Sequence, residues 1–311
     1  MKQELKIPKV FIIVLNWNGW RDTIGCLESL QKIDYPNCEV LVIDNGSADD
    51  SVERIKGFLN SPPNKLRAAV YDLQFNLGFA GGNNFGIKYA LESGADYVLL
   101  LNNDTTVAPD FLTKLIEVGE SGKEIGVLGP VIYFFDEPRR IWFGGSRINR
   151  LRNKATHLHY GETRDLGTKF FETDYITGCA LLIKKEVIDK IGPMMEDYFL
   201  YYEDADWNLR ARKAGYKIVL APAAKIWHKI SASTKEFSPN YIYYHVRNGL
   251  ILSRRHGTVL TKSIVHLLIA WTLAKQIVKL LIPSKRSWAK ATINGISDFY
   301  RGRTGPITLN S

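Results

Sequence analysis

The apolar and polar residues of the chain alternate between short apolar runs and longer segments with helical spacing. The runs predict buried strands at residues 10–15, 39–43, 67–71 and 97–101. The segments between and after them predict helices at residues 20–32, 51–59, 85–92 and 109–119. Strands that alternate with helices in this way indicate an open α/β sheet.

The second half of the chain has a less regular pattern. Residues 126–175 mix aromatic and basic positions, which indicates strands and loops. After them the pattern predicts a strand, a helix, a helix that ends at Gly215 and a short strand, at residues 177–183, 184–191, 201–216 and 217–220.

Residues 263–282 form an apolar stretch about as long as a helix that crosses a bilayer. The polar residues in and beside it fall on about one half of a helical wheel: Lys262, His266, Thr272, Lys275, Gln276 and Lys279. This arrangement favours a helix that lies in the membrane interface over one that spans the membrane. The alternative is a helix packed on the domain or on a second subunit, as in a homodimer.

Length and charge narrow the choice of architecture and partner. The 311 residues, 45% of them apolar, suit one large domain or a domain with an appendage. The net charge is +9, but residues 254–303 hold ten Lys or Arg and one acid, which leaves 31 basic and 31 acidic residues elsewhere. A neutral body with a basic tail favours an anionic membrane surface and disfavours a nucleic-acid partner.

The cysteines and the apolar residues near the N-terminus indicate the cellular compartment in which the protein would fold. Cys26, Cys38 and Cys179 have no paired or metal-type spacing, so we expect no disulfide framework and a reducing compartment. The apolar run at residues 10–15 leads into Asn16-Trp17-Asn18-Gly19 without a cleavage site. We therefore interpret it as a buried strand and expect no secretory signal.

Polar residues gather where each of the first four predicted strands ends. In open α/β sheets, ligands bind beyond these carboxyl ends. The four segments are Asn16 to Gly19, Asp44 to Ser47, the loop 76–84 and Asn102 to Asp104. Glycines in the third segment would let a backbone approach a phosphate closely, and Asn83 or Asn84 would cap the helix that follows.

Two acidic groups stand out as candidates for chemistry. Asp104 with its neighbouring amides could hold Mg²⁺ only if a substrate diphosphate completes the metal shell. Glu203 and Asp204 diverge by about 100° on a helix, so one could act as a general base while the other anchors the helix. His228 is a candidate ligand for the same metal.

Taken together, these segments resemble the inverting glycosyltransferases of family 2, in particular the rhamnosyltransferase-like branch. The resemblance runs over residues 10–256 through VLNWNG, VLVIDNGSADDS, NLGFAGGNNFGI, LLLNNDTTVAPDFL, TGCALLIKKEVIDKIG, YFLYYEDADWNLRARKAGY and WHK. It implies a GT-A fold over residues 1–256, with a nucleotide-binding half at about 1–125 and an acceptor-binding half at about 126–256. Residues 257–311 would form a basic amphipathic helical extension that associates with the membrane.

The resemblance also implies roles for individual residues. Asp204 matches the catalytic base, with Glu203 as its neighbour. Asp104 matches the last acid of the metal-binding DXD motif and His228 a metal-ligand histidine, with Mg²⁺ or Mn²⁺ as the cofactor. Asn102 stands where many members have Asp, so the metal site has one negative charge fewer. The nucleotide sugar would be bound by Asn16, Asn18, Asp44, Asn76, Gly78, Gly82, Asn83, Asn102, Asn103 and Asp104.

The implied reaction is transfer of a sugar, with rhamnose favoured, from a nucleoside-diphosphate sugar to a saccharide or polyprenyl-linked acceptor. The branch favours dTDP-rhamnose, while UDP-GlcNAc or UDP-galactofuranose would suit the same fold. The place implied is the cytoplasmic face of the plasma membrane, as a peripheral enzyme of cell-surface polysaccharide synthesis. A sugar nucleotidyltransferase would need a Gly-rich, Arg-containing loop after the first strand, and a membrane-surface binding module would leave Asp104, Asp204 and His228 unexplained.

Overall fold

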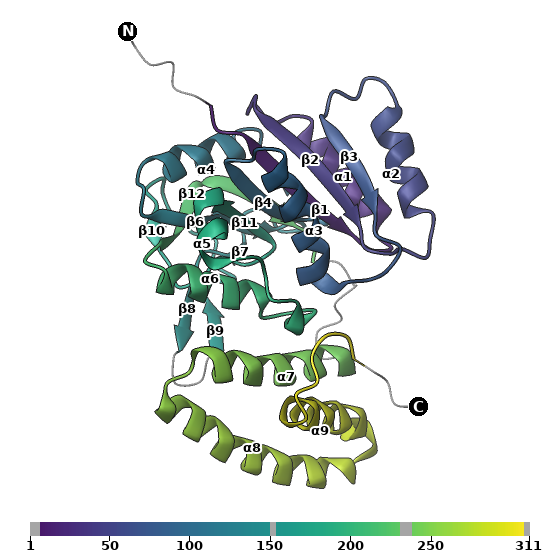
Figure 1. Ribbon diagram of the computed structural model, residues 1–311, viewed down its shortest axis with the longest axis vertical. Coiled ribbons are helices and arrows are strands. Elements are labelled where there is room, and N and C mark those ends of the chain that lie inside the picture. Colours follow the sequence, from purple (N-terminus) through teal and green to yellow (C-terminus); the bar gives the residue numbers. More distant parts are fainter. Residues whose placement is uncertain (1–6, 150–153, 231–237, 308–311) are drawn as a thin grey trace.

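The computed structural model describes residues 7–149, 154–230 and 238–307. It contains a mixed β-sheet flanked by helices, with a separate group of helices from the C-terminal end beneath it (Figure 1). The strand order along the main sheet is β10-β12-β6-β11-β4-β1-β2-β3, with β5 paired to β12 and β7 paired to β6. The open α/β sheet expected from the sequence is therefore confirmed.

The first half of the sheet is parallel. β1 (Val10–Asn16) lies between β2 (Cys38–Asp44) and β4 (Tyr97–Asn102), and β3 (Ala68–Asp72) pairs with β2 at the edge. Residues 10–14 are fully buried, as expected for a strand covered on both faces. The connecting helices are α1 (Trp20–Leu30), α2 (Ser51–Asn60), α3 (Gly78–Glu92) and α4 (Phe111–Glu120).

The second half extends the sheet with strands of both directions. β11 (Ala180–Lys184) runs antiparallel to both β4 and β6 (Ile125–Phe134), and β12 (Lys217–His228) runs parallel to β6. The smaller strands are β5 (Thr105–Val107), β7 (Ile141–Phe143), β10 (Phe171–Glu172) and the hairpin of β8 (Ser146–Asn149) with β9 (Lys154–His157). The helices of this half are α5 (Lys185–Ile191), the 3₁₀ turn η1 (Glu196–Tyr198) and α6 (Glu203–Lys213).

Two elements differ from the sequence-based expectation in their length. α3 begins at Gly78, so most of the expected loop 76–84 is helical. A Cβ on Gly82 would lie 2.5 Å from Leu15 Cδ1, so glycine lets this helix rest directly on β1. β12 continues past residue 220 to His228, because a register shift between Ala221 and Lys225 accommodates Pro222 within the strand.

The helix expected at 201–216 begins two residues later, at Glu203. Tyr201 and Tyr202 have φ values of 68° and 75°, a left-handed conformation that stops the helix from extending backwards. Gly215 follows the end of α6 as expected, with a φ of 95°.

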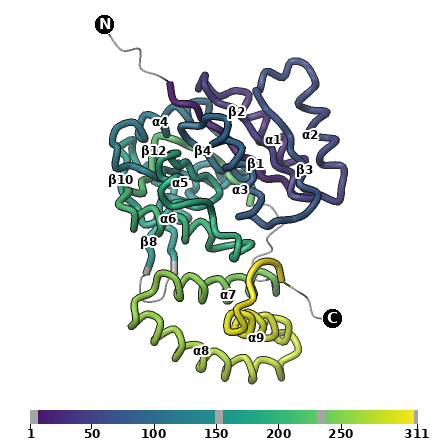
Figure 2. Tube along the Cα trace, in the orientation of Figure 1, coloured from purple at the N-terminus to yellow at the C-terminus, as the bar shows by residue number. Residues whose placement is uncertain are grey.

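Three helices close the chain: α7 (Pro239–His256), α8 (Val259–Leu280) and α9 (Arg286–Tyr300), with the 3₁₀ turn η3 (Pro283–Lys285) before the last. They lie together on one side of the molecule, below the sheet in the view of Figure 2. α9 packs against both α7 and α8, and α7 also contacts η1. The expected boundary at residue 256 stays a prediction, although α7, which precedes it, packs with the helices that follow it.

α8 corresponds to the predicted helix at 263–282, but it starts earlier because Thr258 Oγ1 accepts a hydrogen bond from Thr261 N. Its inner side is covered, with Thr261, Ile269 and Gln276 buried. Its outer side exposes large apolar side chains, namely Val259, Leu260, Leu267, Leu268, Trp271, Ile277 and Val278. By length and composition, α8 is the one helix of the described residues that could cross a membrane.

Candidate active site

Three parallel strands end side by side at one edge of the sheet. Asn16 at the end of β1 stands in register with Asp44 at the end of β2, and Leu15 with Asn102 at the end of β4. The sheet reverses its strand order between β1 and β4, which is where open α/β sheets bind ligands. The polar residues predicted at the strand ends therefore share one edge.

Asn16 joins these strand ends through its side chain. Its Nδ2 donates to Asp44 Oδ2 at 2.6 Å, and its Oδ1 accepts from Thr23 Oγ1 at 2.7 Å. Asn103 Nδ2 donates to the same Thr23 hydroxyl oxygen at 3.0 Å. Asn16, Asp44 and Thr23 are fully buried, so they form the floor of the site.

Asp44 orders the turn that follows β2. Its carboxylate accepts hydrogen bonds from Ser47 N at 2.8 Å and from Ser47 Oγ at 2.7 Å, besides that from Asn16. Asn18 adds a second tie, because its Oδ1 accepts from Ala48 N at 2.8 Å. The loops after β1 and β2 are thus held together. The expected contacts of Asp44 and Asn18 with a nucleotide stay predictions.

Asn45 was not among the predicted site residues, yet it links β2 to α3. Its Nδ2 donates to Asn76 Oδ1 at 3.1 Å and to Gly78 O at 3.0 Å, and its Oδ1 accepts from Leu77 N at 2.9 Å. The available signal was its position in the same strand-end segment as Asp44. Asn45 fixes the start of α3 over the site.

The expected capping role of Asn83 or Asn84 is wrong, because both residues lie inside α3. Asn83 Nδ2 donates to Phe79 O at 2.9 Å within the helix. Asn84 instead bridges to the other half of the molecule, where it donates to Met194 O and Glu196 Oε1, both at 2.9 Å.

Gly78 brings the two halves into direct contact. It has a φ of 73°, and a Cβ at this position would lie 2.3 Å from Phe199 O. The next residue, Phe79, donates its N–H to the same Phe199 oxygen at 2.7 Å. Only glycine allows the start of α3 to approach the segment before α6 this closely.

Asp104 and His228 come together from opposite parts of the chain. Asp104 lies in the turn between β4 and β5, and β5 pairs with the end of β12, where His228 faces Thr105. His228 Nε2 lies 3.0 Å from Asp104 Oδ1, and both side chains are about nine-tenths buried. Burial lowers the pKa of His228, but the adjacent Cys179 and Asp104 outweigh this effect and raise it to about 10.

Asp104 and His228 lie at an ion-pair distance that would also suit two neighbouring ligands of one metal ion. In an octahedral shell with bonds of about 2.1 Å, adjacent ligand atoms lie about 3.0 Å apart, which matches the Asp104–His228 distance. His228 Nδ1 is buried without a hydrogen-bond partner among the described residues. Among all the residues that the structure describes, no group of three or more His, Cys, Asp or Glu is placed so that it could hold a metal ion. A cation held here would therefore take its remaining ligands from water or substrate.

Asp204 is held at the start of α6 by backbone amides. Its Oδ2 accepts from Gly178 N at 2.9 Å and its Oδ1 from Ala205 N at 2.7 Å. Burial raises the pKa of Asp204, and these amide bonds oppose the rise. Asp204 is half-buried.

Glu203 has a different environment from its neighbour. It is buried, and its Oε2 has no hydrogen-bond partner among the residues described. Burial raises the pKa of Glu203 well above its ordinary value, and the nearby Asp204 adds to the rise. A carboxyl with a raised pKa holds its proton more readily than an exposed glutamate does, which disfavours Glu203 as the group that abstracts a proton.

Cys179 connects the two acidic groups. Its carbonyl oxygen accepts from Asn102 N at 2.9 Å, and the preceding residue, Gly178, donates to Asp204. Burial raises the pKa of the Cys179 thiol; His228 opposes the rise, and Asp104 and Asp204 add to it. Asp104, His228 and Asp204 therefore lie around the short segment of Gly178 and Cys179, at the edge of the sheet where β4 ends.

α7 holds the strained segment that leads to Asp204. Asn248 Nδ2 donates to the carbonyl oxygens of Tyr198, Leu200 and Tyr201 at 2.9, 2.7 and 3.0 Å. Asn248 is fully buried, and the segment contains three residues with positive φ, namely Phe199, Tyr201 and Tyr202. No sequence motif identified Asn248, because its partners are backbone atoms distant along the chain.

A second tie joins α7 to α6 itself. The Asp206 carboxylate lies 2.8 Å from His256 Nε2 and accepts from Arg210 Nε at 2.8 Å. Burial raises the pKa of Asp206, but His256 and Arg210 outweigh it and lower the value. Asp206 therefore fixes the helix that carries Asp204.

Comparison with known proteins adds relatives to this geometry. The family model described as Glycosyl transferase family 2 matches residues 11–192. A dTDP-rhamnosyl transferase, RfbF, of Shigella flexneri is 26% identical over 97% of this chain and 99% of its own length. An N-acetylglucosaminyl-diphospho-decaprenol L-rhamnosyltransferase of Mycobacterium tuberculosis is 24% identical over 74% of this chain and 80% of its own.

A solved structure supports the fold. The mannosyltransferase PcManGT from Pyrobaculum calidifontis, in complex with GDP-Man and Mn²⁺, superposes with a TM-score of 0.60. The superposition covers 95% of this chain and 88% of that chain at 15% sequence identity. The mixed sheet with flanking helices is thus GT-A-like, as the resemblance implied.

Proposed function

This chain belongs to glycosyl transferase family 2, and we propose that it transfers rhamnose from dTDP-rhamnose to a hydroxyl of a saccharide or polyprenyl-linked saccharide. The match with RfbF supports the donor, because it spans nearly the whole of both chains. The mycobacterial rhamnosyltransferase supports a lipid-linked acceptor and a place in cell-surface polysaccharide synthesis. The chain is a glycosyltransferase; the donor, the acceptor and the residue roles below are the proposal.

In this proposal Asp204 is the general base. Its carboxylate accepts the proton of the acceptor hydroxyl while that oxygen attacks the anomeric carbon of the donor. The bond from the anomeric carbon to the diphosphate oxygen breaks, and the nucleoside diphosphate leaves with the bonding electrons, so the sugar inverts. Two backbone amides orient Asp204, and burial raises the pKa of Glu203 beside it.

Asp104 and His228 would hold a divalent cation, Mg²⁺ or Mn²⁺. Their 3.0 Å separation and their oxygen and nitrogen donors fit this role. A bound cation stabilises the negative charge that develops on the departing diphosphate. The PcManGT complex with Mn²⁺ supports a cation in this fold. Asn102, whose side chain is half-buried at the end of β4, would lie beside the diphosphate.

The nucleotide would lie over the joined ends of β1, β2 and β4. The remaining proposed contacts come from that edge and from the start of α3: Asn16, Asn18, Asp44, Asn76, Gly78, Gly82, Asn83 and Asn103. Asn16 and Asp44 satisfy each other and their neighbours, so they would shape the binding surface and present the adjacent loops.

We assign the exposed face of α8 to the membrane interface, at the cytoplasmic face. Large apolar side chains on the outer side of α8, together with basic residues nearby, support this attachment. Lys275 lies on the same helix with its Nζ 4.6 Å from the centroid of the Trp271 ring, an arrangement suited to the boundary between headgroups and acyl chains. The alternative occupant of this face is a second subunit.

The observation that carries the proposed function is the grouping of Asp204 with Asp104 and His228 around Gly178 and Cys179. The experiment is a donor screen with the purified full chain. Thermal shifts are measured with dTDP-rhamnose, UDP-GlcNAc, UDP-galactofuranose and the free nucleotides, with and without Mn²⁺. We expect the largest cation-dependent shift with dTDP-rhamnose. A larger shift with a UDP-sugar would reassign the donor, and no shift with any of these nucleotide sugars would overturn the proposed donor.

A further inference from the structure

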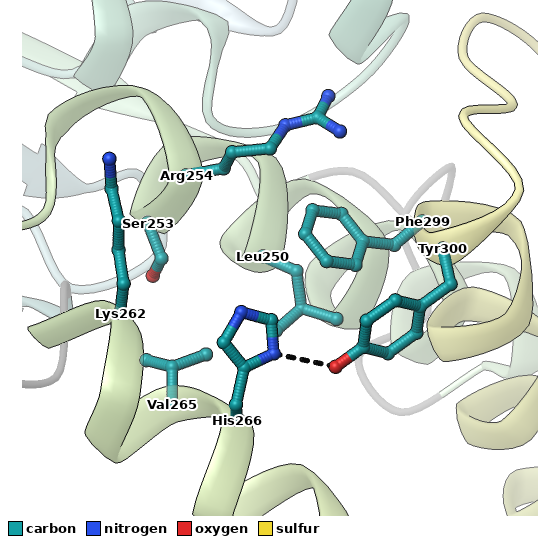
Figure 3. Close-up of a pocket in the computed structure, with 8 residues that line it drawn as sticks. All are labelled: Leu250, Ser253, Arg254, Lys262, Val265, His266, Phe299 and Tyr300. Carbon is teal, nitrogen blue, oxygen red and sulfur yellow. Dashed lines mark hydrogen bonds between the residues drawn. The ribbon is translucent and has the colours of Figure 1, made fainter. Parts of the chain in front are cut away.

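A pocket of about 210 Å³ lies within the C-terminal helices, away from the candidate active site. It is formed by α7, α8 and the end of α9, and Figure 3 shows the side chains that line it: Leu250, Ser253, Arg254, Lys262, Val265, His266, Phe299 and Tyr300. Nothing in the glycosyl transfer described above uses this pocket.

The lining combines cationic groups with a fixed aromatic base. Arg254 from α7 and Lys262 from α8 are exposed, and the lining contains no acidic residue. The Arg254 guanidinium lies 5.1 Å from the centroid of the Phe299 ring, and His266 Nδ1 lies 2.6 Å from Tyr300 Oη. The pocket is thus electropositive, and the Arg254 and His266 side chains are held against Phe299 and Tyr300 of α9.

The charges of Arg254 and Lys262 are not neutralised by carboxylates of the described residues. The adjacent Arg255 forms an ion pair with Asp197 at 2.6 Å. Asp298 is the one acidic residue of residues 254–303; it lies 3.3 Å from Arg303 and accepts a hydrogen bond from Tyr243 Oη. Within the part of the chain that the structure describes, Arg254 and Lys262 form no ion pair. The Arg254 and Lys262 side chains both belong to the pocket lining, and guanidinium and ammonium groups are the cations that bind phosphate in proteins.

The pocket also lies at a suitable depth for a lipid headgroup. Lys262 and Trp271 are about two and a half turns apart on α8, so they lie on opposite sides of the helix. If the side of α8 that carries Trp271 reaches the boundary with the acyl chains, the pocket lies on the opposite side of the helix. It is then about one helix diameter, roughly 10 Å, further from the acyl chains. An interfacial helix sinks about 5–10 Å, which places the pocket at the level of the lipid phosphates.

We propose that this pocket binds the headgroup phosphate of an anionic phospholipid of the bilayer. The inference rests on the membrane attachment in the proposed function, and it adds a defined lipid site to an otherwise unspecific apolar face. Phosphate occupancy would orient α7 and α8 on the membrane. Because Asn248 and His256 of α7 contact the segment before α6 and α6 itself, this orientation would also set how the active site faces the bilayer.

The test is co-sedimentation of the full chain with vesicles of phosphatidylcholine, with and without phosphatidylglycerol. The double variant Arg254→Gln/Lys262→Gln should partition about 30-fold more weakly into phosphatidylglycerol vesicles, since each basic residue near an anionic leaflet contributes about fivefold. Its matched control is Arg67→Gln/Lys56→Gln, which removes the same charge from exposed positions of the sheet domain. The control should lose much less of its binding to phosphatidylglycerol vesicles.

A second variant distinguishes binding of a lipid in the pocket from general electrostatic attraction between basic residues and an anionic membrane. Val265→Phe fills the pocket without changing the charge, and it should lose the preference for phosphatidylglycerol. Equal losses for the double variant and its control, or full lipid preference in a folded Val265→Phe, would overturn the pocket. Inorganic phosphate, compared with chloride at equal ionic strength, should compete weakly; full competition would mean that the site takes any phosphate and not a lipid.

The outcome also distinguishes this inference from the proposed function. If the wild-type chain binds neither vesicle, the membrane attachment fails together with the lipid site. If the wild type binds phosphatidylglycerol vesicles and the pocket variants bind equally well, the attachment stands and only the lipid site fails. Rhamnosyl transfer to a soluble acceptor should be unchanged in the double variant in either case.

Discussion

His228 Nε2 lies 3.0 Å from Asp104 Oδ1, although Asp104 follows β4 and His228 ends β12. The contact depends on the pairing of β5 with β12, which sets Thr105 opposite His228. This pair joins the two halves of the sheet at the edge where the parallel strands end. It is also the pair to which we assign the cation.

We expect loss of either member of this pair to weaken the response to metal. Asp104→Asn and His228→Ala should raise the Mn²⁺ concentration for half-maximal activity by at least about tenfold, the loss seen even for outer-shell partners of metals. The Mn²⁺-dependent thermal shift with nucleotide sugar should shrink in parallel. Asp189→Asn, an exposed carboxylate on α5, is the control. Full activity of the wild type in excess chelator would remove the metal role.

Substitution of the proposed base should abolish turnover but spare the donor site. Asp204→Asn keeps the shape of the side chain and should lower kcat by about 10²- to 10⁴-fold with little change in donor affinity. Glu203→Gln is the matched control, and it should keep kcat within a few-fold because burial raises the pKa of Glu203 and so disfavours the ionised form that a base needs. Single-turnover kinetics and donor titration measure both quantities. A reversed ranking of the two variants would exchange their roles.

The raised pKa of Glu203 should appear in the pH dependence of stability. Below its ordinary value of 4.5, Glu203 is protonated in both the folded and the unfolded state. As pH rises from there toward the folded pKa, the unfolded state loses its proton first, so this group lowers the free energy of unfolding. Glu203→Gln removes that effect, and its Tm relative to wild type should rise with pH over this window.

Thermal unfolding from pH 4 to 8 measures this difference, with exposed Glu53→Gln as the control that should show no such slope. A difference in Tm between Glu203→Gln and wild type that stays constant with pH would show that Glu203 is ionised in the folded protein.

Gly78→Ala should damage both stability and donor binding. The positive φ alone costs about 1–2 kcal/mol for a residue with a Cβ. A clash with Phe199 O at 2.3 Å adds about 1–3 kcal/mol, as overpacking does. Gly94→Ala is the control, because Gly94 has a φ of 80° but open space around its Cβ position. Denaturant unfolding and the donor KM report the two effects, and equal destabilisation of the two variants would show that the Phe199 contact is unimportant.

The exposed face of α8 should control membrane binding without supporting the fold. Leu267→Gln, Trp271→Gln and Val278→Gln together should reduce vesicle binding at least about tenfold, since each removes apolar area that would enter the bilayer. Tm should change little, because these side chains are already exposed. The control is Tyr160→Gln with Phe170→Gln, which removes exposed aromatic side chains that lie outside α8. Point substitutions are cleaner than removal of residues 260–311, because α9 packs on α7 and Asp298 bonds Tyr243.

Unchanged vesicle binding with a loss of dimer in size-exclusion chromatography would instead assign the α8 face to a second subunit.

Much of the sheet could be predicted because the signal is local. The apolar runs at residues 10–15 and 97–101 are covered on both faces, and burial on both faces requires apolar residues at every position. Boundaries were wrong where packing overrode local preference. The glycines of α3 suggested a loop, but they serve close contact with β1. The strand expected at residues 217–220 instead continues to His228, because a bulge keeps β12 continuous.

The sequence by itself determined which residue types stand at the ends of the strands, and hence the family and the candidates Asp104, Asp204 and His228. It did so because strand periodicity and polar strand ends are properties of a few consecutive residues. Only the tertiary structure decided that Glu203 is buried while Asp204 keeps some exposure, that Asn248 holds the strained segment before α6, and that α8 turns its apolar side outward. Each of these depends on contacts between segments far apart in the chain, which local patterns do not encode.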